Sequence, residues 1–170
     1  MMSSERFLID SNVFIEAKYF HYNFNYCRIF WDFILDLHSK GLVYSINAVR
    51  KELTIKDDEL SDWVKNEVPS GFFEDENTSF NSYAQLMTWS QSLDVHEKAK
   101  IDFADITKAD AFLIAHAMSH NMSIITHEAE KPGAKRRILI PNAAKAQGVK
   151  TITLFEFLAI YSGQNFTMKP

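Results

Sequence analysis

Short apolar segments alternate with segments of helical spacing along most of this chain, and this alternation limits the folds that are open to it. The apolar segments are typical of buried strands and are residues 6–9, 42–46, 72–73, 123–126 and 151–154. Strands that alternate with helices build a parallel sheet covered on both faces. We therefore expect an α/β fold, a three-layer α/β/α sandwich with a central parallel sheet of four to five strands.

The segments between the strands have the apolar spacing of amphipathic helices. The predicted helices are residues 12–19, 28–40, 47–53, 57–67, 80–89 and 110–121, with a last helix that ends near residue 160. Gly41 is expected to end the second helix, and Asn47 to cap the third. The inward-facing positions are expected to include Ile29 in the second helix and Ala84 in the fifth.

The composition is that of one folded domain in a reducing compartment. The chain has 170 residues, 46% of them hydrophobic, and its 14 Phe, 6 Tyr and 3 Trp argue against disorder. Cys27 is the only cysteine, so no internal disulfide can form, and we expect this side chain to pack rather than react. No apolar stretch is long enough to span a membrane, and residues 1–6 lack the features of a signal peptide. We expect a single domain over residues 1–170 in the cytoplasm.

The charge is distributed unevenly. The formal net charge of −4 argues against a purely electrostatic nucleic-acid binder. Nine acids nevertheless lie within residues 52–76, and six bases without an acid lie within residues 131–150. Two solvated faces are the simpler interpretation of these runs. The basic run is alternatively a surface that follows the phosphates of a nucleic acid.

Four carboxylates are expected at one edge of the predicted sheet. Asp10 follows the first strand, Glu52 lies in the helix after the second, and Asp110 begins a helix. Glu128 follows the strand at residues 123–126. Ligand sites in such sheets lie outside the carboxyl ends of the strands, where these acids would repel one another unless cations or protons compensate them. Mg²⁺ or Mn²⁺ suits such oxygen ligands, and a metal that activates water can hydrolyse a phosphodiester.

Each of these acids also has an ordinary structural explanation. Asp10 could cap the first helix, and Glu52 could be one of several solvent-facing acids. Thr107 is placed to cap the helix that begins at Asp110, with Asp110 in its first turn. Acids that compete with the four for a place in the site are Asp102, Asp105 and Glu130.

Three stretches resemble the PIN domain, a family of metal-dependent ribonucleases that includes the VapC-type toxins. Residues 7–15 resemble the opening strand of the family and its Asp-(Ser/Thr)-Asn turn. Residues 46–53 resemble the segment with the second acid, and residues 110–128 the segment with the third and fourth acids. With residues 138–141 and 151–158, the resemblance covers nearly the whole chain, and it is strongest to an uncharacterised bacterial subgroup with aromatic N-terminal helices.

The resemblance implies a Mg²⁺- or Mn²⁺-dependent endoribonuclease in which metal-activated water cleaves RNA. Asp10, Glu52, Asp110 and Glu128 would hold the metal, and Asn12, assisted by Ser11, would orient water or phosphate. The family usually has Asp where this chain has Glu128, which puts the fourth ligand and a second metal in question. The resemblance further implies the toxin of a type II toxin–antitoxin pair, with an antitoxin protein as partner and a homodimeric assembly. The alternative is a metal-poor PIN-like scaffold that binds RNA or protein.

Two further patterns carry alternatives. His116 and His120 lie four residues apart on a predicted helix and His127 follows, but no HExxH motif or cysteine pair supports zinc, so ordinary surface or packed histidines are favoured. The aromatic run at residues 19–26 could stack on bases, pack in the core or contact a protein. Packing or protein contact is the favoured role.

Overall fold

The computed structural model describes residues 4–170, so the first three residues of the segment considered for a signal peptide lie outside the described residues. The described residues form a sheet of five parallel strands in the order β3-β2-β1-β4-β5. The strands are β1 (Phe7–Ile9), β2 (Val43–Ile46), β3 (Phe73–Glu74), β4 (Ser123–Ile125) and β5 (Thr151–Ile152). The predicted α/β class and strand number are confirmed.

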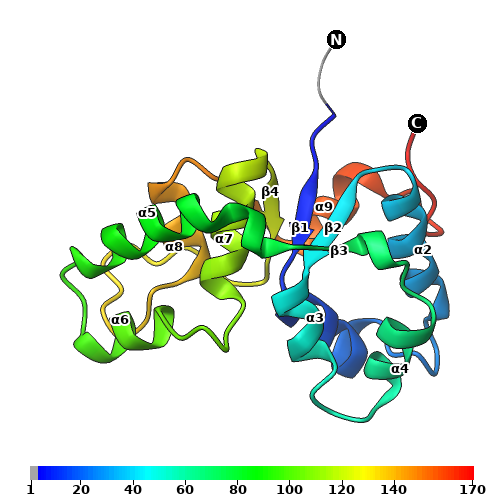
Figure 1. Ribbon diagram of the computed structural model, residues 1–170. Coiled ribbons are helices and arrows are strands. Elements are labelled where there is room, and N and C mark those ends of the chain that lie inside the picture. The colour runs from blue at the N-terminus through cyan, green and yellow to red at the C-terminus, as the bar shows by residue number, and fades with distance from the viewer. Residues whose placement is uncertain (1–3) are drawn as a thin grey trace.

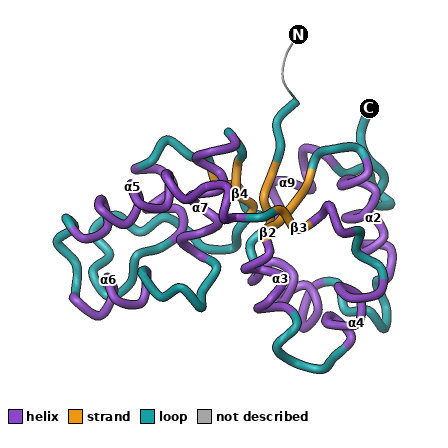
Figure 2. Tube along the Cα trace, in the orientation of Figure 1, coloured by secondary structure: helices purple, strands orange, loops and turns teal. Residues whose placement is uncertain are grey.

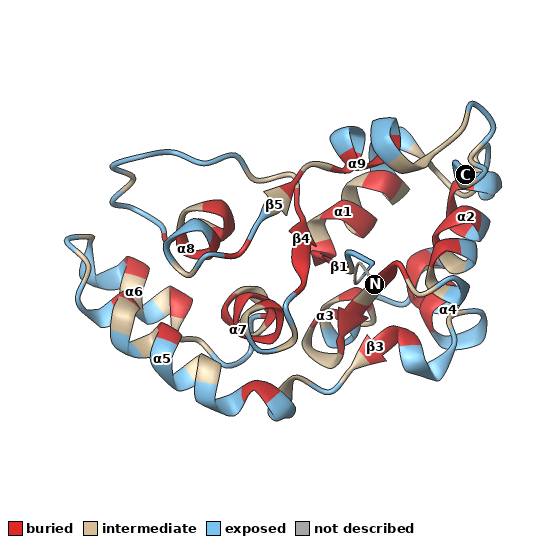
Figure 3. Cartoon of the chain, turned by 90° about the horizontal axis from the view of Figure 1, so that it is seen from above, coloured by how far each residue is buried: buried red, intermediate tan, exposed pale blue. Residues whose placement is uncertain are grey.

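Helices cover both faces of this sheet. The α-helices of the described residues are α1 (Ser11–Glu16), α2 (Arg28–Ser39), α3 (Asn47–Leu53), α4 (Glu59–Asn66), α5 (Phe80–Gln91), α6 (Glu97–Phe103), α7 (Asp110–His120), α8 (Ile140–Ala146) and α9 (Leu154–Tyr161). Helices α5 to α8 lie on one side of the strands, and α1, α2, α4 and α9 lie on the other (Figures 1 and 3). The short strands therefore sit between two groups of helices (Figure 2), as a three-layer sandwich requires.

Strand β1 lies at the centre of the sheet and of the core. Its three residues, Phe7, Leu8 and Ile9, are completely buried, as expected for a strand with a neighbour on each side and helices on both faces. The Phe7 ring packs edge-on against Phe157 of α9, with 5.1 Å between the ring centroids. Because β1 cannot shift within this core, the residues that follow its carboxyl end are held firmly in place.

Shorter helical segments adjoin α1, β3 and α5. The π-helical segment η1 (Ala17–His21) continues α1. The 3₁₀ segments η2 (Ser70–Phe72) and η3 (Glu76–Ser79) flank β3, and η3 leads directly into α5. Gly41 follows α2 with φ +80°, a left-handed conformation that glycine adopts without strain, which confirms it as the end of that helix.

Several local predictions were wrong. Ile29 is 48% exposed, because the buried face of α2 is formed by Phe30 and the residues that follow it at helical spacing. Asn47 is the first residue of α3 rather than its cap, and Ile46 occupies the cap position without a side-chain hydrogen bond. Ala84 is exposed, and Leu86 is the completely buried residue of α5.

Within residues 4–170, no helix combines the length and apolar character needed to cross a bilayer.

Candidate active site

Asp10 lies at the carboxyl end of β1 and is completely buried. It occupies the cap position of α1, but its carboxylate makes no capping hydrogen bond, so the capping interpretation does not account for this side chain. Its Oδ2 atom instead accepts a hydrogen bond of 2.9 Å from the Thr126 hydroxyl at the end of β4. The Ser11 hydroxyl lies 3.5 Å from the other carboxylate oxygen. A buried acid with so few donors is poorly compensated if it is ionised.

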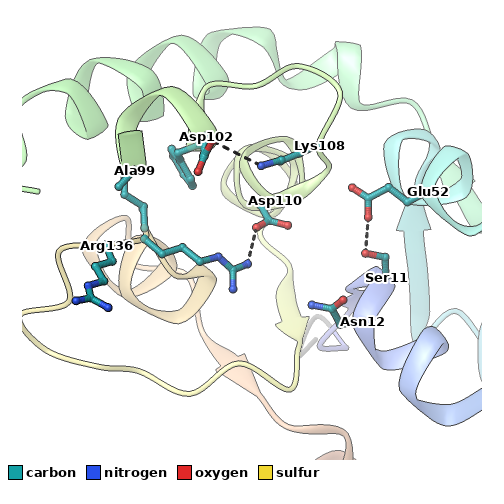
Figure 4. A pocket seen from close by; sticks show the side chains of 11 residues that line it. Ser11, Asn12, Glu52, Ala99, Asp102, Lys108, Asp110 and Arg136 are labelled. Carbon is teal, nitrogen blue, oxygen red and sulfur yellow. Dashed lines mark hydrogen bonds and ion pairs between the residues drawn. The ribbon is translucent and has the colours of Figure 1, made fainter. Parts of the chain in front are cut away.

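Glu52 approaches the same place from α3. Its Oε2 atom accepts a 2.5 Å hydrogen bond from the Ser11 hydroxyl (Figure 4). Its Oε1 atom accepts one of 2.7 Å from the backbone N–H of Ala109. The carboxylate of Glu52 thus faces α1 and the start of α7 and is not the solvent-facing acid of the alternative interpretation. This contact connects three elements that are far apart in the sequence.

Asp110 and Glu128 share one positively charged partner, Arg137. The Nη2 atom of Arg137 lies 2.6 Å from Glu128 Oε1 and 3.4 Å from Asp110 Oδ2. The other oxygen of Glu128 accepts a 2.8 Å hydrogen bond from the backbone N–H of Ile140, the first residue of α8. The Glu128 side chain is only 10% exposed, so its ion pair is partly shielded from water.

A cavity of about 340 Å³ opens beside these groups. Asn12, Glu52 and Asp110 line it together with Ser11, and the Asn12 side chain lies between Ser11 and Asp110 (Figure 4). Cationic side chains also line it, namely Lys108, Arg136 and Arg137. The cavity therefore presents acids and bases to the same space, which suits a ligand that carries a phosphate on one side and binds through a cation on the other.

The electrostatics of Asp10 show that the three other predicted acids act on it. Burial, the charge of Asp110 and smaller contributions from Glu128 and Glu52 together raise the pKa of Asp10 to about 8, against the opposing hydrogen bond from Thr126. Arg137 provides part of the missing positive charge. Burial lowers the pKa of Arg137, but Glu128 and Asp110 outweigh that effect and hold the pKa above its ordinary value.

The donors present fit a hard divalent cation in kind, since they are carboxylates beside an amide. The pKa of Asp10 is raised by burial first and by the neighbouring acids second, so a positive charge beside it would favour its ionised form. As the side chains stand, no group of three or more Asp, Glu, His or Cys within residues 4–170 is placed to hold a metal ion. Glu52 is hydrogen-bonded to Ser11, and Arg137 is hydrogen-bonded to Asp110 and Glu128, the two outer acids of the group. Metal binding thus requires some of these carboxylates to change partners.

The competing acids separate from the site to different degrees. Asp102 lines the cavity and lies 3.9 Å from the Lys108 ammonium group. Asp105 accepts hydrogen bonds from the backbone and the hydroxyl of Thr107, so Thr107 does not cap α7 as predicted. Glu130 pairs with Lys145 at 3.0 Å instead of facing the other acids.

The histidines do not form the zinc group that their spacing suggested. His116 is buried, lies 3.0 Å from the Ser79 hydroxyl and 3.1 Å from Glu74, and burial lowers its pKa. The His120 ring is tilted against it, with 4.2 Å between the ring centroids. His127 lies elsewhere, against Phe155 and 3.5 Å from a Glu16 oxygen.

The bases of the run between residues 131 and 150 have different partners. Lys135 pairs with Asp94 and Lys145 with Glu130, so two of its charges are compensated locally. Lys150 pairs with Glu5, beside the amino end of β1. Only the middle of the run, residues 136–137, lines the candidate site.

The aromatic run is divided between core and surface. Tyr22 stacks on Phe30 with centroids 4.3 Å apart, and Phe24 stacks on Trp31 at 4.1 Å. The exposed members are Tyr19, Phe20 and Tyr26. Packing is confirmed for Tyr22 and Phe24, and Cys27 is likewise packed against the core.

Sequence reasoning did not single out Thr126 or Arg137 as site residues. Thr126 belonged to the resembling segment and stood two residues before Glu128, so its position at a strand end was a usable signal. Arg137 carried no comparable signal, because it was one of six bases in a run and nothing in the run shows which of them turns inward.

Comparison with protein families finds one model, described as a domain of unknown function (DUF4411), that matches residues 7–164. The match includes all four acids and Arg137. Comparisons with curated proteins and with solved structures found no match.

Proposed function

The chain belongs to the DUF4411 family, and we propose that this member is a Mg²⁺- or Mn²⁺-dependent endoribonuclease of the PIN type. One observation carries the proposal: Asp10, Glu52, Asp110 and Glu128 come from four separate segments and converge at the carboxyl edge of the sheet strongly enough to alter the pKa of the most buried one. The resemblance of the same segments to PIN ribonucleases supports RNA as the substrate.

The four carboxylates and Asn12 would hold the cation and the water that attacks. The bound cation would activate that water and offset the charge that develops on the phosphate. Asp10, buried behind the others, would supply a fixed ligand because β1 cannot move. Asn12 has an amide that can orient the attacking water, and Lys108 and Arg136, which line the same cavity, would supply positive charge to an RNA phosphate. No covalent enzyme intermediate is needed.

Cleavage of single-stranded RNA in the presence of Mn²⁺ tests the proposal. We expect wild-type protein to cleave and Asp110→Asn to lose at least about 100-fold in rate, since one ligand and its charge are removed. Asp32→Asn is the matched control, because Asp32 is an exposed acid on α2 that pairs with Arg28. Asp32→Asn is expected to cleave like wild type.

Calorimetric titration with Mn²⁺ separates this function from the scaffold alternative. The enzyme should bind Mn²⁺ at a site that Asp110→Asn weakens at least about tenfold. That no three ligands stand ready within residues 4–170 favours the scaffold alternative, which is supported further if Mn²⁺ neither binds nor supports cleavage. DNA of the same sequence, offered beside RNA, identifies the nucleic acid that is cleaved.

We further propose, on the PIN resemblance, that the protein is the toxin of a type II pair and assembles as a homodimer. Expression with and without the product of a small neighbouring gene tests the toxin role. Growth arrest that this product relieves would support it, whereas equal growth in both cases would contradict it. Light scattering of the purified protein gives the oligomeric state.

A further inference from the structure

Arg137 holds the two outer acids of the proposed metal site. It lies in the connection between β4 and α8 and contacts Glu128 at 2.6 Å and Asp110 at 3.4 Å through one nitrogen. Both acids are proposed ligands of the divalent cation. A guanidinium group and a metal ion at the same carboxylate oxygens repel each other and share the same negative charge, so the two cations compete for Glu128 Oε1 and Asp110 Oδ2.

Arg137 can give up its contacts with Asp110 and Glu128 to a metal ion only if its side chain moves, because it cannot lose its charge. A guanidinium group keeps its charge at any pH a protein tolerates, so it cannot leave the acids by losing a proton. The Arg137 side chain is 55% exposed, however, so it can turn out of the acids without disturbing the core. Glu128 keeps its second hydrogen bond, to the Ile140 N–H, after the arginine departs.

The space that Arg137 would enter is the cavity that it already lines. That cavity also holds Asn12 and the two other cations, Lys108 and Arg136. A released guanidinium would there add a planar group with several N–H donors, which matches two oxygens of a phosphate. The same side chain could therefore pair with the two acids before the metal binds and with a substrate phosphate afterwards.

We propose that Arg137 exchanges partners in the catalytic cycle: it competes with the divalent cation for Asp110 and Glu128, and the cation releases it to bind the RNA phosphate. This inference rests on the proposed metal-dependent function. It assigns Arg137 as a substrate-binding residue and explains why the acids are not arranged as a ready metal site.

Mn²⁺ titration by calorimetry, which needs no RNA, tests the competition. Arg137→Gln should bind Mn²⁺ about tenfold more tightly than wild type, because the competing cation is gone. Arg137→Lys keeps the charge without the planar fork and should fall between them. Arg136→Gln removes the same charge from a neighbour that lines the cavity but contacts none of the four acids in the described part of the chain. Its Mn²⁺ affinity should stay within about twofold of wild type.

RNA cleavage at saturating Mn²⁺ tests the release. Arg137→Gln should raise the KM for RNA about tenfold, since the phosphate loses a charged partner. Circular dichroism confirms that each variant is folded. Equal or weaker Mn²⁺ binding by Arg137→Gln would overturn the exchange, since a purely structural arginine gives that result. An unchanged KM would overturn the phosphate contact.

The failure of the underlying function gives a different result. If wild type, Arg137→Gln and Arg136→Gln all fail to bind Mn²⁺, the proposed metal-dependent function is contradicted and the exchange falls with it. If wild type binds Mn²⁺ and cleaves RNA while Arg137→Gln binds Mn²⁺ no more tightly, only the exchange is contradicted.

Discussion

Asp10 has the most unusual environment of any carboxylate described in this chain. It is completely buried, receives a 2.9 Å hydrogen bond from the Thr126 hydroxyl and has three other acids near enough to raise its pKa. Without a cation nearby, the protonated form is favoured at neutral pH. A proton on Asp10 and the charge of Arg137 thus stabilise the group of acids in the way that the proposed metal ion would.

The stability of the metal-free protein should therefore depend on pH in a direction opposite to that of an ordinary acid. The pKa of Asp10 is about 8 in the folded chain and near its ordinary 3.8 when unfolded. Between these values the folded state binds more protons, so stability is full at low pH and is lost as the pH rises toward 8. Urea unfolding in EDTA should show a contribution of about −1 kcal/mol per pH unit from this residue.

Asp10→Asn should remove this contribution. The amide is neutral at every pH, so the variant should be more stable than wild type at pH 8 and nearly equal to it at pH 4. The same variant should lose RNA cleavage, because a charged ligand is lost. Identical pH profiles for the two proteins would show that Asp10 is ionised throughout in the folded state.

His116 gives a second pH dependence of the opposite sign. Burial lowers the pKa of His116 despite the nearby Glu74, so the unfolded state takes up a proton first as the pH falls. His116→Gln should therefore lose about 1 kcal/mol less stability than wild type between pH 6.5 and 5 in urea unfolding. His96→Gln, at an exposed position, serves as the control and should match wild type.

At the scale of elements, the connection between β4 and α8 is held through Glu128. The Glu128 side chain accepts from the first N–H of α8, and its own N–H donates to Thr126, which in turn donates to Asp10. Most of residues 126–139 have no regular structure, so the segment is held by these bonds together with those between Lys131 and Asn142 and the ion pair of Lys135 with Asp94. The position of Arg137 depends on the same anchor.

Removing the anchor should loosen this segment. Glu128→Ala leaves the Ile140 N–H without its partner, and we expect a loss of about 1–3 kcal/mol in unfolding free energy. Hydrogen exchange of residues 127–140 should accelerate more than that of β1. Glu130→Ala removes an exposed acid that pairs with Lys145, and it should change exchange little. Equal acceleration in both variants would contradict the anchoring role.

The elements that the sequence predicted are those with a strong periodic pattern. The five strands and helices such as α7 were predicted because apolar residues recur at a clear spacing. Helix α6 was missed because only Ala99 and Phe103 of its seven residues are buried, and α8 because a proline near its start and several alanines give little contrast.

The site shows the same limit. The four acids could be located because strand ends in a parallel sheet meet at one edge. The hydrogen-bond partners of these acids could not be predicted. The bond from the Ala109 N–H to Glu52, for example, joins residues 57 positions apart and depends on how α3 and α7 pack. Likewise, a count of six bases does not show that one of them turns back onto the acids.

At the scale of the whole molecule, a cation at the sheet edge would link the two groups of helices. The proposed ligands come from α3, from the start of α7 and from the ends of β1 and β4. One ion would therefore connect the elements on both sides of the cavity of the candidate site. The net charge of −4 then describes the function poorly, because four of the acids belong to the proposed site.

Mn²⁺ should therefore stabilise the folded chain. At a free concentration of about 100 times Kd, the unfolding free energy should rise by about 2.7 kcal/mol. For a chain of 170 residues this corresponds to a rise of roughly 5–10 °C in Tm, measured by thermal unfolding. Asp110→Ala should abolish the shift. A shift of equal size in that variant would place the ion elsewhere.

The two hydrogen bonds of the Glu52 carboxylate, from the Ser11 hydroxyl and from the Ala109 N–H, affect how mutant alleles at this position would be interpreted. A substitution at Glu52 removes a proposed ligand and also releases the start of α7, so inactive alleles at this position should accumulate to lower levels in cells. Under the proposed toxin role, a screen for survivors of its expression would recover Glu52 alleles whose products are degraded. Steady-state abundance has to be measured beside survival before such an allele is assigned to chemistry.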